Sequence, residues 1–251
     1  MSIAEIFKGE HFALDENKLI SIEDAAEKIN YEPFCEILGI RPKHLFLNPD
    51  GFINRYCYWD GLYYHPFMSL DMAILNMNMG NYSQAELINK RIKYVHSAYE
   101  SKQWKEIIKF TDKKVLFHVY KKLMPLIPEE ERANAFLEIH IRSESGYDMD
   151  LVRSVIDGPK DASYDISNAR MKPIDGYYII YRGSTPESTQ VDEAFSWTLS
   201  KEIAEFFAGR FDSNGVVYQA KVHKEKVKAF IDNKEQEVIV FPEDITGIEE
   251  I

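Results

Sequence analysis

The sequence contains few of the residues that mark disulfide-stabilised, metal-binding or membrane-spanning proteins. Only two of its 251 residues are cysteines, Cys35 and Cys57, which is too few for a disulfide framework, and no Cys-x-x-Cys pair suggests a metal site. No run of about 18 apolar residues is present. The segment from Met1 to Glu5 has neither the basic nor the apolar region of a secretory signal. We therefore expect a cytoplasmic protein with no membrane segment, or an effector that a dedicated machine exports.

The motifs of several common enzyme classes are absent as well. The chain has no Gly-x-x-x-x-Gly-Lys-Ser/Thr phosphate loop, no Gly-x-Gly-x-x-Gly, no His-Glu-x-x-His and no Gly-x-Ser-x-Gly. The seven histidines are scattered, and His118 and His140 fit partly buried helix positions better than metal-ligand positions. These absences leave P-loop enzymes, zinc proteases and serine hydrolases with little support.

What the chain does contain is typical of a globular protein with a real core, since 45% of its residues are hydrophobic and 28% are charged. Its net charge of -11 argues against general nucleic-acid binding. The segment 90–122 is different, with ten Lys or Arg and three Asp or Glu. This basic segment could dock an anionic partner, and a solvated helix face explains the same pattern. Both interpretations stay open.

The pattern of residues 1–82 predicts a small α+β region of unknown role. Ser21 followed by Asp24 fits the start of a short helix, which we place at 20–29. The aromatic-rich segment 55–64 predicts two short strands around an Asp-Gly turn. Its rings could form a stacking surface or fill a small core.

Helices are predicted for most of residues 83–170. Apolar residues recur at helical spacing over 83–140, and Ser83 fits the first N-cap. Pro125 and Pro128 should interrupt this pattern, because proline cannot sit inside a helix. A further short helix is expected at 148–156.

From Gly176 onward the pattern changes to β-structure. We expect one helix at 200–210 and strands at 177–182, 193–197, 215–222, 228–231 and 237–241. One helix cannot cover both faces of such a sheet, so two small packed sheets with the upstream helices against them would bury the apolar faces. The predicted fold class is α+β, with a second domain at 83–251 whose helical part is 83–170 and whose β-rich core is 171–251.

Three short motifs follow one another in this β-rich part. Arg182-Gly183 ends the first strand, Ser196-Trp197-Thr198 precedes the helix, and Glu235-Gln236-Glu237 opens the last strand. An arginine, a serine and a glutamate at strand edges in this order resemble the Arg–Ser–Glu signature of the ADP-ribosyltransferases. That family cleaves NAD and transfers ADP-ribose to an acceptor. The resemblance implies a helical part followed by a split β-sandwich with NAD in its central cleft.

The resemblance also implies roles for single residues. Glu237 matches the catalytic glutamate, and Glu235 matches the preceding acid that engages the acceptor, where glutamate is typical of enzymes that modify arginine. Ser196 would hydrogen-bond the catalytic glutamate or the nicotinamide ribose, and Thr198 would brace the same strand. Trp197 stands where the family has threonine, and its side chain should pack on the opposite face.

The chemistry of the residues agrees with these roles. A carboxylate at a strand edge can stabilise an oxocarbenium-like charge, and an arginine such as Arg182 offers a fork of donors to phosphate or ribose oxygens. On an extended segment Glu235 and Glu237 would point to one side, and their repulsion would raise one pKa. Gly183 would let a ligand approach the backbone. A charged turn and a surface arginine are the plain structural alternatives.

In the helix at 200–210 we expect an inward-facing stripe of Ile203, Phe206, Phe207 and Phe211. One of its aromatic rings, Phe207 among them, could stack on nicotinamide as an aromatic residue does in the family. Arg210 could reach the diphosphate, or simply interact with the helix dipole.

The expected function is mono-ADP-ribosyl transfer with NAD as substrate, in a toxin or a phage-derived modifier. A protein arginine is the favoured acceptor, and segment 90–122 leaves a nucleic-acid acceptor open. One alternative is a catalytically inactive relative that binds NAD or a partner, and another is a phage structural or interaction protein.

Overall fold

The structure is a computed structural model that describes residues 13–25, 30–51, 53–78, 82–143, 147–186, 188–210 and 214–251, without the side chains of 75–78 and 82–84. The chain folds into two units, Met1–Val155 and Ile156–Ile251. The boundary expected at residues 82 and 83 therefore lies inside the first unit. The reason is that α4, which begins at Tyr82, packs against the helices before it, α2 and α3.

The first unit contains a four-stranded antiparallel sheet in the order β1-β2-β3-β4. The strands are β1 (Ile20–Ser21), β2 (Leu45–Leu47), β3 (Tyr56–Trp59) and β4 (Tyr64–Phe67). The predicted hairpin at 55–64 is confirmed, and it turns at Gly61, whose φ is +87°. The predicted helix at 20–29 is wrong for its described part, because Ile20 and Ser21 pair with β2 instead. Residues 26–29 lie outside the described residues.

Seven α-helices of the first unit are described: α2 (Glu32–Leu38), α3 (Leu70–Asn78), α4 (Tyr82–Glu100), α5 (Trp104–Phe110), α6 (Leu116–Leu123), α7 (Glu129–Arg142) and α8 (Met149–Val155). The helices expected over 83–140 and 148–156 are confirmed. As predicted, α6 ends before Pro125, and α7 starts directly after Pro128 with three glutamates in its first turn. The N-cap expected at Ser83 lies outside the described side chains. His140 is buried and His118 is half-buried.

The second unit is built on a six-stranded antiparallel sheet in the order β10-β7-β5-β6-β9-β8. The strands are β5 (Tyr177–Ser184), β6 (Ser196–Thr198), β7 (Val216–His223), β8 (Val227–Ile231), β9 (Glu237–Val240) and β10 (Ile245–Glu250), and the helix is α9 (Lys201–Ala208). All five predicted strands and the helix are confirmed within a few residues. Strand β10 was not predicted.

The two expected sheets instead form one hydrogen-bonded sheet. The halves β10-β7-β5 and β6-β9-β8 are joined between β5 and β6 by a single residue pair, Tyr181 with Thr198. Buried side chains from both halves nevertheless share one core cluster, which includes Ile180, Ala220, Trp197 and Val238. Trp197 packs in this core, as expected.

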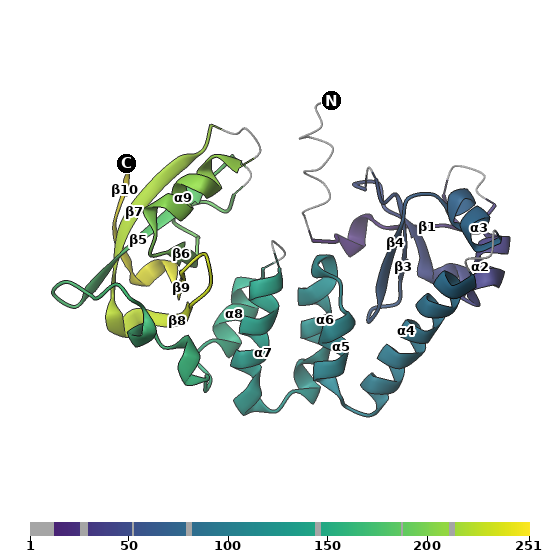
Figure 1. Ribbon diagram of the computed structural model, residues 1–251, viewed down its shortest axis with the longest axis horizontal. Helices are drawn as coiled ribbons and strands as arrows, with labels where there is room; N and C mark the ends of the chain where they lie inside the picture. Colours follow the sequence, from purple (N-terminus) through teal and green to yellow (C-terminus); the bar gives the residue numbers. More distant parts are fainter. Residues whose placement is uncertain are drawn as a thin grey trace. The chain divides into compact units, whose positions relative to one another are not determined.

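Helix α9 lies on the other face of β5 and β7, and Figure 1 shows it running along these strands. Glycine at 183 makes this approach possible. A Cβ atom built at Gly183 would lie 1.9 Å from the carbonyl oxygen of Ala204, and one at Gly215 would lie 2.2 Å from that of Ala208. Both distances are impossible for real atoms, so only glycine fits where the helix backbone meets the sheet.

Candidate functional site

Sheet topology brings the three motifs together, although they are far apart in sequence. Arg182 lies on β5, Ser196 on β6 and Glu237 on β9, and these strands are consecutive in the sheet. The register pairs Thr198 with both Tyr181 and Glu237. The arginine, serine and glutamate therefore meet where the two halves of the sheet join.

Two hydrogen bonds link the three residues, one through the Ser196 hydroxyl and one through the Ser196 main-chain carbonyl. The Ser196 hydroxyl donates to Glu237 Oε1, and Arg182 Nη1 donates to the Ser196 carbonyl oxygen at 2.6 Å. The guanidinium makes the Arg182 bond charge-assisted, and the Ser196 bond is charge-assisted when Glu237 is ionised. The contact expected between Ser196 and the glutamate is thus present.

Glu237 is a buried charge-bearing group at the first position of β9. It is 8% exposed, and the three strand residues after it are completely buried. A carboxylate removed from water in this way is costly unless hydrogen bonds compensate it, which the Ser196 hydroxyl does in part. The result is a carboxylate held in one position before any ligand arrives, which is the preorganisation that catalysis requires.

The segment before Glu237 differs from the extended strand that we expected. Gln236 has a φ of +47°, so the chain turns there and Glu235 lies outside β9. The two glutamates consequently do not share one side of an extended segment: Glu235 is exposed whereas Glu237 is buried. The Thr198 hydroxyl donates to the Glu235 carbonyl oxygen, and Leu199 N–H donates to that of Gln236 at 3.1 Å. Thr198 therefore braces this turn, whereas it was expected to brace the strand that carries Ser196.

The other expected cofactor-binding residues belong to α9 or contact it. The close approach at Gly183 is made by the helix, which accounts for the glycine without a ligand. Ser200 is the N-cap, accepting from Ile203 N–H at 3.2 Å. Arg210 places its guanidinium 4.9 Å from the Phe207 ring centre, a cation–π contact. The hydrogen bonds that join Arg182, Ser196 and Glu237 include neither Phe207 nor Arg210.

The predicted inward-facing stripe of α9 is wrong in part. Phe206 is 63% exposed, and the fully inward positions are Ala204 and Ala208. Only small side chains fit there, because the helix backbone touches Gly183. The spacing Ala-x-x-x-Ala, read together with a glycine in the neighbouring strand, is the signal that could have identified this face. Phe211 lies outside the described residues.

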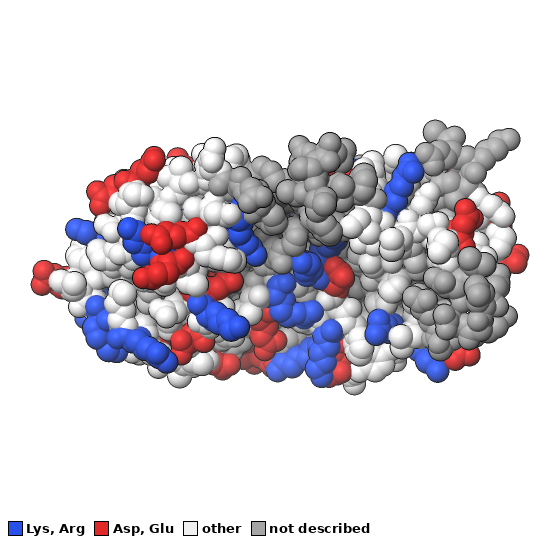
Figure 2. All heavy atoms as spheres, turned by 45° about the horizontal axis from the view of Figure 1, so that its top comes forward, with Lys and Arg blue, Asp and Glu red and all other residues white. Residues whose placement is uncertain are grey.

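A surface pocket of about 370 Å³ in this unit is separate from the motifs. It is lined by Asp165, Ile166, Ser167, Lys172, Pro173, Tyr178, Lys224 and Glu225. Its lining includes two lysines and two carboxylates, so it carries charges of both signs. On the face drawn in Figure 2, Lys/Arg and Asp/Glu side chains are both present over the C-terminal unit.

The basic segment 90–122 occupies α4, α5 and α6 of the first unit. Four of its lysines are paired with acids: Lys90 with Glu86, Lys105 with Glu131, Lys109 with Glu106 and Lys121 with Asp148. These ion pairs neutralise part of the positive charge of the segment. This agrees with the interpretation of the segment as a solvated helix face.

Metal and membrane features were also sought. Among the described residues, no group of three or more His, Cys, Asp or Glu could hold a metal ion. In the same part of the chain, no helix has the combination of length and apolar composition that crossing a membrane requires.

Comparison of the chain with protein-family models, with curated proteins and with solved structures found no match. The resemblance to the ADP-ribosyltransferases therefore rests on the three motifs and on the geometry that joins them.

Proposed function

We propose that this chain is a mono-ADP-ribosyltransferase that cleaves NAD and transfers ADP-ribose to a macromolecule. The observation that carries the proposal is the network in which Arg182 holds Ser196 and Ser196 holds Glu237. Three motifs that are each weak alone come from three consecutive strands, with Ser196 bonded to Arg182 through its backbone carbonyl and to Glu237 through its hydroxyl. A chance set of surface residues has no reason to be connected in this way.

The chemistry of the network suits breakage of a glycosidic bond. When the bond between the ribose and the nicotinamide breaks, its electron pair leaves with the nicotinamide and positive charge develops on the ribose. The fixed, buried carboxylate of Glu237 stabilises that charge. The acceptor nucleophile then forms the new bond to the ribose and releases its proton. Arg182 and Arg210 supply guanidinium groups for ribose or phosphate oxygens.

The fold is compatible with the expected split β-sandwich. Two three-stranded halves share one core, and the ladder that links them beside the motif residues is a single residue pair. A split β-sandwich of this kind would hold the dinucleotide beside Ser196 and Glu237.

The exposure of Glu235 supports its assignment to the acceptor. Its carboxylate is accessible beside the buried Glu237, and its backbone is fixed by Thr198. A carboxylate in this position can pair bidentately with a guanidinium. A protein arginine is therefore the favoured acceptor, and a toxin or a phage-derived modifier is the favoured biological setting.

The second candidate function is an inactive relative that binds NAD or a partner. One observation favours it: Arg182 Nη1 and the Ser196 hydroxyl are already occupied within the protein, so the same network could serve stability alone.

Incubation of the purified chain with isotopically labelled NAD and a cell lysate separates the two functions. A transferase labels a macromolecule, and mass spectrometry then identifies the modified residue. Binding of NAD by calorimetry, with neither labelling nor nicotinamide release, would instead establish the inactive relative.

A further inference from the structure

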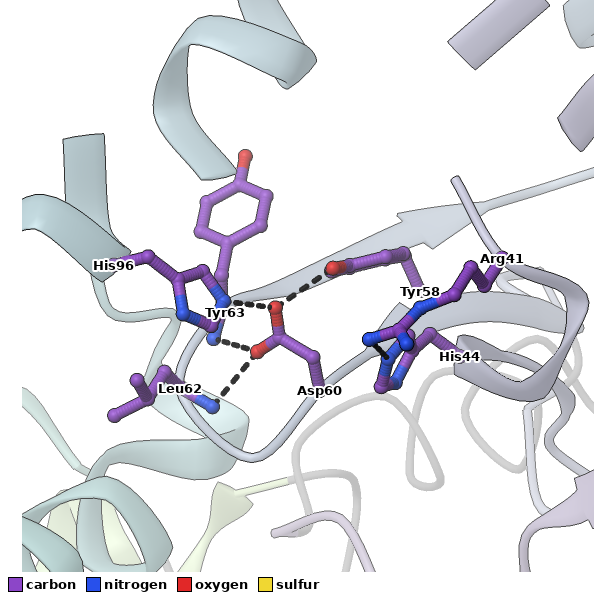
Figure 3. A network of polar contacts seen from close by, with 7 residues as sticks. All are labelled: Arg41, His44, Tyr58, Asp60, Leu62, Tyr63 and His96. Carbon is purple, nitrogen blue, oxygen red and sulfur yellow. Dashed lines mark hydrogen bonds and ion pairs between the residues drawn. The ribbon is translucent and has the colours of Figure 1, made fainter. Parts of the chain in front are cut away.

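The first unit contains a buried carboxylate that no motif indicated. Asp60 lies in the turn between β3 and β4, and four donors surround it (Figure 3). Its Oδ1 accepts from the N–H groups of Leu62 and Tyr63, both at 2.9 Å. Its Oδ2 accepts from the Tyr58 hydroxyl and from His96 Nε2, both at 2.7 Å. Each oxygen of the carboxylate thus accepts two hydrogen bonds.

These bonds keep Asp60 ionised although its side chain is only 3% exposed. Burial alone would raise the pKa of Asp60, but the hydrogen bonds from His96, Tyr63, Tyr58 and Leu62 outweigh it and lower that pKa. An ionised Asp60 requires the proton on Nε2 of His96. The other ring nitrogen, Nδ1, points away from Asp60 in Figure 3, and the His96 side chain is 45% exposed. The turn therefore holds the imidazole in one orientation with its outer edge toward solvent.

Two exposed cations border the same turn. The Lys122 ammonium lies 3.0 Å from the position that a Cβ of Gly61 would take, and 5.9 Å from the Tyr99 ring centre. Arg41 is drawn near the Asp60 network in Figure 3, and its Nη2 lies 3.3 Å from Nε2 of His44. The His44 ring is packed 5.9 Å from the ring of Tyr58.

These cations differ from their neighbours in the basic segment. Lys121, the residue before Lys122, is paired with Asp148. Among the described residues, no carboxylate oxygen lies within 4.0 Å of the charged nitrogens of Lys122 or Arg41. The nearby anion, Asp60, is saturated and buried. The turn consequently presents positive charge and donors to solvent while its negative charge is enclosed.

We propose that the Asp60 turn, with Lys122 and Arg41 beside it, is a docking site for the phosphates of a single-stranded nucleic acid. Phosphate oxygens accept from ammonium and guanidinium donors. Both cations are exposed, which suits the phosphates of a strand better than a single enclosed ion. Tyr99, under the Lys122 ammonium, adds an aromatic ring of the kind on which bases stack.

This site lies in the first unit and does not depend on the Arg–Ser–Glu network. Its binding is measured without NAD, so a failure of the proposed transferase activity would leave the result intact, and the reverse also holds. If both proposals hold, a nucleic acid becomes the acceptor to test first.

The test is fluorescence anisotropy of the full chain with a short labelled single-stranded oligonucleotide, at several salt concentrations between about 50 and 200 mM. Binding should weaken steeply with salt. Lys122→Ala should raise the dissociation constant about 3- to 10-fold at low salt and reduce the salt slope by about 0.7, the value for one lost phosphate contact. Arg41→Ala should weaken binding in the same direction.

Lys109→Ala is the matched control, because it removes the same charge from the same basic segment at a lysine that is paired with Glu106. It should change the dissociation constant less than 2-fold. The Lys122, Arg41 and Lys109 variants should melt like the wild type, since all three side chains are exposed.

Three results would overturn the proposal: no wild-type binding at the lowest salt, equal weakening by Lys109→Ala and Lys122→Ala, or displacement of the oligonucleotide by equimolar inorganic phosphate. Competition by a nucleoside monophosphate distinguishes a nucleic-acid site from a site for a free nucleotide. Displacement at oligonucleotide-like concentrations would mean a free-nucleotide site and would also contradict a nucleic-acid site.

Discussion

The substitution Gly183→Ala tests how α9 is held against the sheet. A Cβ at this position would lie 1.9 Å from the Ala204 carbonyl oxygen and 2.6 Å from the Ala208 nitrogen, and both are backbone atoms. Ordinary contact begins near 3.4 Å, so the helix would have to retreat by about 1.5 Å. Overpacking of this kind costs about 3 kcal/mol, and for a chain of this size it would lower the melting temperature by roughly 6–12 °C.

Gly209→Ala is the control for this substitution. A Cβ at Gly209 would meet its nearest atom, the Glu205 carbonyl oxygen, at 3.5 Å, and the φ of this residue is -84°. The change should therefore shift the melting temperature by no more than about 2 °C. Differential scanning calorimetry of both variants decides the matter. If Gly183→Ala melts with the wild type, α9 does not lie on β5 at this distance and the described packing is refuted.

Three further predictions concern single side chains. Arg182→Ala should raise the dissociation constant for NAD about 10- to 100-fold by calorimetry, with partial recovery in Arg182→Lys; normal binding by Arg182→Ala but not by Arg210→Ala would move the NAD-binding cation to the helix. Glu235→Gln should abolish acceptor labelling while sparing much of the nicotinamide release, and equal loss of both activities would assign Glu235 to the NAD site. Burial lowers the pKa of His65 from 6.5 to about 4. Between these two pH values His65 is protonated in the unfolded chain and neutral in the folded chain. The free energy of unfolding should therefore fall by about 2–3 kcal/mol as the pH drops from about 6.5 to about 4. Urea titrations should show a weaker pH dependence in His65→Gln, and an unchanged dependence would refute the role of His65.

The sequence predicted the elements whose pattern is local. Alternating apolar residues identified five of the six strands around the motifs, and prolines identified the break between α6 and α7. Strand β10 was not predicted because only its first residue, Ile245, is buried. The five residues after it, from Thr246 to Glu250, are all exposed. An edge strand of this kind is stabilised by its pairing with β7 and has no apolar alternation.

Features that depend on contacts between distant segments were not predictable in the same way. The positive φ of Gln236 separates the exposed Glu235 from the buried Glu237. The sequence pattern of this segment predicts an extended strand and does not indicate the turn. The helix at 20–29 failed because pairing of Ile20 and Ser21 with β2 overrode a plausible capping signal. The Asp60 turn showed only as an Asp-Gly hairpin, since its partner His96 is 36 residues away.

The central claim is that the Glu237 carboxylate stabilises the charge that develops on the NAD ribose. The most direct measurement is the rate of nicotinamide release from NAD by purified wild type and Glu237→Gln, with NAD affinity measured on the same samples. Glu225→Gln, which neutralises an exposed carboxylate of the same unit, is the control. The account predicts a rate about 10²–10³ lower in Glu237→Gln, with NAD affinity and the control rate almost unchanged. Release by Glu237→Gln at the wild-type rate would contradict it.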